Sequence, residues 1–112
     1  MANTFKNSKL INVGTGATTL YTVPSSTTTV VIGLNIANKN ASSRTITASW
    51  TDATDSDNST CLLNEVAIPG DTSLEVFAGQ KIVLMTGDVL KILASATSSI
   101  DATVSYMEIT SS

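Results

Sequence analysis

The sequence predicts an all-β fold: a single antiparallel β-sandwich, jelly-roll-like, with about eight or nine short strands. Short extended segments rich in β-branched residues alternate with turn signals roughly every 8–12 residues. No segment repeats its apolar residues with the period of a helix over a helical length. Roughly three residues in ten are Ser or Thr, well above ordinary usage, and Thr favours strands.

The chain has 112 residues, and no repeat or linker divides it, so we expect one domain over residues 1–112. Phe5–Val13 is the first strand candidate, and residues 1–9 can also be interpreted as an extended amino-terminal arm. Gly14-Thr15-Gly16 is predicted to turn the chain before the next extended run, Leu20–Val23.

Thr27–Ala37 is predicted to be the central strand, with which the other segments pair or over which they pack. Pro24 ends the run before it, because Pro fixes φ and has no N–H for a ladder. The even positions have the period of a strand with one buried face. They are Val30, Ile32, Leu34 and Ile36. Among the odd positions, which are otherwise small or polar, Val31 is the exception.

The middle of the chain predicts two more strands. Residues 38–43 read as a polar hairpin loop, and Arg44–Thr51 then alternates cleanly, with Trp50 expected in the core. Cys61–Ile68 is extended, with a bulge or turn expected at Asn64-Glu65. Cys61, the one cysteine, is interpreted as a small buried residue.

The last third predicts four short strands. Pro69-Gly70-Asp71 is a turn in which Gly is expected to supply a positive φ, and Ala78-Gly79-Gln80 is another. Lys81–Met85 has apolar residues at both odd and even positions, so it is expected to be covered on both faces. The other segments are Ser73–Phe77, Val89–Ala94 and Ile100–Ile109. In the last of these the inward residues should be Ile100, Ala102, Val104 and Tyr106.

Composition excludes several classes of function. The net charge is −3 and no basic run occurs, so we expect no binding to nucleic acid or to an anionic membrane surface. No stretch approaches the roughly 20 apolar residues of a membrane helix. Residues 1–5 contain no apolar run of the kind found in signal peptides, so we expect no secretion by the usual route. The chain has no histidine, which removes Ser-His-Asp and Cys-His catalysis. We therefore expect a non-enzymatic protein without a cofactor.

The acidic loop over residues 52–60 is the best metal candidate. Asp55 and Asp57 have the spacing that starts a calcium loop, but Thr60 and Val66 stand where that loop needs Gly and Glu. The preferred interpretation is a solvated acidic loop, with no metal.

Low charge favours assembly. Only 13% of the residues are charged, against about 25% in ordinary domains. A β protein with so few charges risks aggregation unless its edges are covered, and assembly covers them.

Five segments resemble small tailed-phage virion proteins: Leu20–Pro24, Val30–Asn38, Gln80–Leu84, Gly87–Lys91 and Val104–Thr110. Within that group the chain is similar to capsid decoration (cement) proteins. The resemblance implies a protein made in the host cytoplasm that binds the outside of the virion shell as a dimer or trimer. There it would staple neighbouring subunits of the major capsid protein.

Candidate partner contacts lie in the amino-terminal arm and in two loops. They are Phe5, Lys6, Lys39, Arg44, Asp52, Asp55 and Asp57. Two other roles stay open: a tail or fibre component, including a receptor- or glycan-binding module, and a virion-associated hydrolase. A glycan site would need exposed aromatic residues, and the absence of histidine disfavours the hydrolase.

Overall fold

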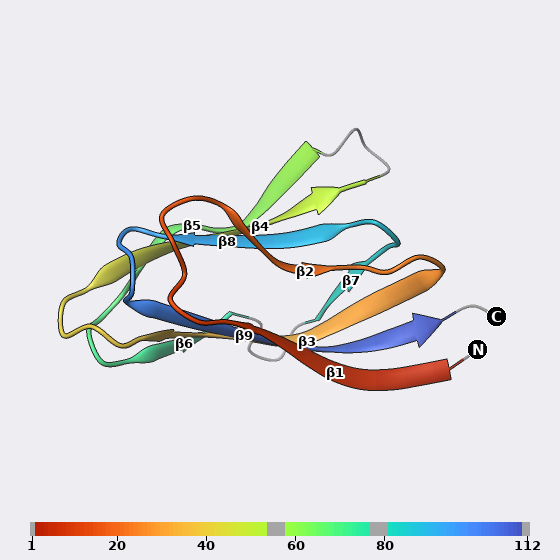
Figure 1. Cartoon of the computed structure of the whole chain (residues 1–112), viewed down its shortest axis with the longest axis horizontal. Helices are drawn as coiled ribbons and strands as arrows, with labels where there is room; N and C mark the ends of the chain where they lie inside the picture. Colours follow the sequence, from red (N-terminus) through yellow and green to blue (C-terminus); the bar gives the residue numbers. More distant parts are fainter. Residues whose placement is uncertain (1, 54–57, 77–80, 111–112) are drawn as a thin grey trace.

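A computed structural model describes residues 2–53, 58–76 and 81–110, which form nine strands in two packed antiparallel sheets (Figure 1). The strands are β1 (Ala2–Leu10), β2 (Thr18–Thr22), β3 (Thr27–Asn38), β4 (Arg44–Asp52), β5 (Asn58–Ile68), β6 (Ser73–Glu75), β7 (Ile82–Leu84), β8 (Val89–Ala94) and β9 (Ile100–Thr110). The predicted all-β sandwich is confirmed. The described residues contain no helix long and apolar enough to cross a membrane.

The two sheets have the strand orders β1-β9-β3-β6, with β7 also on β3, and β2-β8-β4-β5. The predicted central strand β3 pairs with β9 on one side and with β6 and β7 on the other. β9 lies between β1 and β3. Ala2 at the start of β1 pairs with Thr110 at the end of β9, so the first strand begins and the last strand ends at the same end of the sandwich.

The core lies between the sheets and is filled by aliphatic side chains. The largest fully buried ones are Leu34, Ile36, Ile46, Ile68, Leu84, Leu90, Ile92 and Ile100. Along β9, the alternation predicted from the sequence is confirmed, and each of its four predicted inward residues is at most 5% exposed. Trp50 is only half-buried and packs against the side of this core rather than in it.

A β-bulge at Ile32 changes which side chains of β3 face the core. The register with β9 shifts there, so that Val31 is buried before the bulge and Leu34 and Ile36 after it. The single buried face predicted from the sequence is therefore wrong for Val30 and Ile32, which are partly exposed. One inserted residue exchanges the two faces of a strand.

A second irregularity lies where the sequence predicted it. The β4–β5 register shifts around Asn64 and Glu65, and Glu65 has a φ of 51°. The prediction for Cys61 is wrong, because its side chain is exposed on β5, opposite Ser49 of β4. Its local sequence is apolar, but β5 is an edge strand with one open face.

Residues 39–43 do not form a hairpin, because β3 and β4 belong to different sheets. The segment crosses between the sheets, and Asn38 anchors it by donating from its amide to the Ser42 and Ile68 carbonyls. The neighbouring Pro-Gly-Asp turn forms as predicted, but the positive φ of 56° belongs to Asp71. Gly70 is needed because a Cβ there would lie 2.1 Å from the Ala41 carbonyl oxygen.

Two predicted strands have other bounds than expected. The first, predicted over Phe5–Val13, forms over Ala2–Leu10 with the same length of nine residues, and Ser73–Phe77 contracts to β6. Phe77 and the predicted turn at residues 78–80 lie outside the described residues. The prediction that Lys81–Met85 is covered on both faces is wrong within one chain: Leu84 is buried, but Val83 is 56% and Met85 53% exposed.

Candidate functional site

The predicted contact residues do not converge on one site. Lys39 and Arg44 lie where β3 ends and β4 begins, whereas Phe5 lies opposite Met107 of β9. Ile100 of β9 pairs with Asn38, so the two groups are separated by about seven residues of strand, or roughly 23 Å.

Lys39 and Arg44 have structural partners in this chain. The Lys39 ammonium lies 3.1 Å from Asp101 and 2.6 Å from the Asn12 side-chain oxygen. The Arg44 guanidinium donates to the Ser99 hydroxyl at 3.3 Å. The pKa of Asp101 is lowered, first by the backbone N–H of Asn12 and then by Lys39. These contacts fasten loops at this end of the sandwich.

Only part of the acidic loop belongs to the described residues. Asp52 ends β4 opposite Asn58, and Asp55 and Asp57 lie outside the described residues. In the part of the chain that the structure describes, no three His, Cys, Asp or Glu side chains gather in a way that could hold a metal ion.

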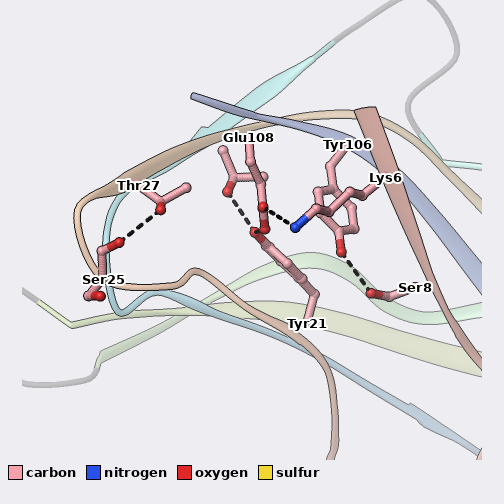
Figure 2. Close-up of polar contacts among 8 residues, drawn as sticks. Lys6, Ser8, Tyr21, Ser25, Thr27, Tyr106 and Glu108 are labelled. Atoms are coloured by element: carbon pink, nitrogen blue, oxygen red, sulfur yellow. Dashed lines mark hydrogen bonds and ion pairs between the residues drawn. The ribbon is translucent and has the colours of Figure 1, made fainter. Parts of the chain in front are cut away.

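A buried carboxylate organises the opposite end of the sandwich (Figure 2). Glu108 of β9 is 5% exposed and is held by side chains from two other strands. Its Oε1 lies 2.8 Å from the Lys6 ammonium of β1, and its Oε2 accepts a 2.6 Å hydrogen bond from the Tyr21 hydroxyl of β2. Thr29 of β3 lies 2.8 Å from the same hydroxyl. Since Tyr21 has one proton and gives it to Glu108, Thr29 is the donor in that contact.

These contacts shift the ionisation of all three titratable groups. The Lys6 hydrogen bond, followed by the Tyr21 hydrogen bond, lowers the pKa of Glu108. Glu108 raises the pKa of Lys6 in return. Burial raises the pKa of Tyr21 well above its usual range, and the hydrogen bond to Glu108 adds to that rise. Near neutral pH the group is therefore an ion pair with a neutral phenol.

Two tyrosines add a second link between the sheets. The rings of Tyr21 and Tyr106 lie 4.1 Å apart between centroids, tilted by 37°, and the Tyr106 hydroxyl lies 3.0 Å from that of Ser8 on β1. All described buried polar side-chain atoms have a partner. The Lys6–Glu108 ion pair and the Ser8–Tyr106 contact fasten the edge strand β1 to the sandwich.

The outer face of the same sheet carries a row of apolar side chains, here called the apolar row. Directly paired residues of four neighbouring strands form it: Phe5 of β1, Met107 of β9, Val30 of β3 and Val83 of β7. Phe5 is 74% exposed and Val83 56%, while the two central members are half-buried. Met85, 53% exposed, follows β7 directly. An exposed apolar strip on an ordered sheet is typical of a protein contact surface.

A shallow depression of about 250 Å³ lies beside the row. It is lined by Phe5, Lys6, Asn7, Ile32, Ser105 and Tyr106. Ile32, where the β3 register with β9 shifts, is one of its lining residues. Of the predicted contacts, Phe5 and Lys6 therefore meet at this surface.

Sequence reasoning missed most of this site, although one signal was present. The inward alternation of β9 continues through Tyr106 to Glu108, which predicts a buried acid that needs partners. The apolar row had no such signal, because it depends on the pairing of strands far apart in the chain.

No family model matches the sequence, and no curated protein matches it either. Solved structures do match. A chain of the acid-stable capsid of Helicobacter pylori bacteriophage KHP30 has a TM-score of 0.57 at 9% identity, covering 99% of this chain and 90% of that one. A chain of the cyanophage Pam1 capsid asymmetric unit has a TM-score of 0.52 at 14% identity, covering 94% and 84%.

A chain of the disulfide-linked pili of Bacillus endospore appendages has a TM-score of 0.54 at 11% identity, covering 100% of this chain and 93% of that one. A chain of the T13 IBDV particle has a TM-score of 0.58, but this protein spans only 30% of its length. At such low identity these likenesses show a shared fold. It is a fold used in viral capsids and in a spore pilus.

Proposed function

We propose that this protein is a non-enzymatic virion structural protein, a capsid decoration (cement) protein of a bacteriophage. It binds the outer surface of the shell and staples neighbouring subunits of the major capsid protein. The observation that carries the proposal is the apolar row, an exposed strip on a rigid sheet that has no use within one chain.

Connectivity supports an assembly role. If β6 and β7 are counted as two halves of one edge, the two sheets have the strand orders produced by two interlocked Greek keys, which define a jelly roll. Jelly rolls are common in viral capsid domains. The likeness to chains of two phage capsids, over most of both partners in each case, is consistent with that use.

Shell binding through the apolar row makes physical sense for a protein of this composition. A single small contact would be weak, because stable interfaces bury about 800 Å² per partner. Repetition over a shell, with each copy touching two coat subunits, adds avidity without larger contacts. The partners expected are the major capsid protein and other copies of this chain, with neither nucleic acid nor membrane.

The test is the copy number of this chain relative to the major capsid protein in purified virions, measured by quantitative mass spectrometry. A ratio near that of the coat protein supports decoration. The shell should then lose stability when the protein is stripped and regain it when the protein is added back. Absence from virions overturns the proposal.

A tail or fibre component is the second candidate. The likeness to the endospore pilus chain, which spans both proteins almost fully, favours a subunit of an extended assembly. A few to a few tens of copies per virion would indicate this role. A receptor- or glycan-binding version of it has weaker support, since Phe5 is the one aromatic residue among the exposed large hydrophobic residues of the described chain.

A further inference from the structure

Strand β1 is an open edge of its sheet, and it differs from the other edges. Its residues pair with β9 in an unbroken register of nine, and no second strand of the described chain pairs with it. Native sheets protect their edges with bulges, short strands or charges. β2 has five residues and a bulge, β6 and β7 have three residues each, and β5 is bulged. β1 has neither a bulge nor a shortened length, and its charged residues are Lys6 and Lys9.

We propose that β1 pairs antiparallel with β1 of a second copy, in the register that places Phe5 opposite Phe5. The result is a two-fold dimer with one continuous sheet across both chains. This inference deepens the assembly role proposed above and rests on it for its biological purpose, although the contact itself is argued from β1 alone.

Charge selects this register. The alternative centred on Lys6 would place two lysines directly opposite each other, and like charges in that position are destabilising. Centring on Phe5 instead sets Lys6 against Thr4 of the second copy. The charge of Lys6 is already compensated by Glu108, 2.8 Å away, and Lys9 lies beyond the paired residues 2–8.

Side-chain pairing across the dimer is also favourable. On the outer face the two Phe5 rings meet as a cross-strand aromatic pair, flanked on each side by Asn3 facing Asn7. The apolar row of one chain then continues into that of the other through the two rings. Phe5, 74% exposed in one chain, becomes the centre of a strip of eight apolar residues on one face, since each copy supplies the same four.

Cysteine cross-linking tests the register. In a Cys61→Ser background, we expect Phe5→Cys to form a disulfide-linked dimer under mild oxidation, because directly opposite Cα atoms lie about 4.5–5.5 Å apart, within disulfide reach. Asn7→Cys is the matched control on the same face. In this register, residue 7 of one copy lies four residues along the strands from residue 7 of the other, roughly 14 Å away. The Asn7 variant should therefore cross-link at least tenfold more slowly. Mixing Asn3→Cys with Asn7→Cys should restore the cross-link.

Light scattering on the unmodified protein should give twice the 11.6 kDa mass of one chain. A monomer at all concentrations overturns the proposal. Equal cross-linking of the Phe5 and Asn7 variants, or a native disulfide through Cys61 on the β5 edge, overturns it as well. All of these measurements use the isolated protein. A dimer that is absent from virions would therefore refute the virion role and leave the β1 interface standing.

Discussion

The Tyr21 hydroxyl and the Glu108 carboxylate join the two sheets through a 2.6 Å hydrogen bond within the protein interior. Tyr21 comes from β2 and Glu108 from β9, and Lys6 of β1 completes the group on the other carboxylate oxygen. A strand at the edge of one sheet is thereby tied to both sheets. The same contacts hold in place β1, the strand that carries Phe5 of the apolar row.

Tyr21→Phe should destabilise the protein by about 1–3 kcal/mol, since it leaves a buried carboxylate oxygen without its donor. Tyr106→Phe is the matched control: its ring is the other member of the same aromatic pair, but its hydroxyl lies near that of Ser8 in a partly buried contact. We expect the control to cost less. Urea unfolding of the two variants measures the difference, and equal losses would show that the Tyr21–Glu108 bond contributes nothing special.

Stability should fall at acid pH through Glu108. Its pKa is lowered in the folded protein, so its contribution is complete above the unfolded value of about 4.3. The contribution is lost as the pH falls through the folded pKa. Glu108→Gln should flatten this acid limb in unfolding experiments between about pH 5 and pH 2. Part of the loss of stability at acid pH should remain in that variant, because the pKa of Asp101 is also lowered. An unchanged limb would contradict the assignment.

Gly70→Ala should cost about 1–3 kcal/mol through overpacking, since its Cβ would collide with backbone atoms of Ala41. Gly16 gives a matched control, because nothing lies within 4 Å of a Cβ built there. Gly16→Ala should be neutral or stabilise by up to about 1 kcal/mol. Melting temperatures of the two variants report this contrast. A Gly70 variant as stable as the control would mean that the crossing loop can move aside.

Local alternation predicted the β-sandwich and the buried face of β9 because each depends on neighbouring residues. The bulge at Asn64-Glu65 was likewise visible where polar residues interrupt an apolar run. The bulge at Ile32 was not, since an unbroken run of β-branched residues hides the inserted position. The predictions for Cys61 and Val83 are wrong for another reason: an apolar local sequence does not reveal which strand lies at an edge.

The site was the least predictable part. Phe5 and Lys6 are contact candidates as part of the predicted amino-terminal arm, and the structure brings them together with Met107 and Glu108 of β9. That pairing joins the two ends of the chain, and no local pattern encodes it. Lys39 and Arg44 are predicted loop charges, and both bond within the same chain, Lys39 to Asn12 and to Asp101 of β9 and Arg44 to Ser99.

Rebinding to stripped shells tests the central claim most directly, namely that the apolar row attaches this protein to a capsid. Val83→Asp alters the row away from β1, and Ile11→Asp is its matched control, because the two side chains are 56% and 58% exposed. At such exposed positions both variants should remain folded. The account predicts that the wild type and the Ile11 variant saturate the shell near coat stoichiometry while the Val83 variant binds at least tenfold more weakly. Equal binding by all three proteins would contradict it.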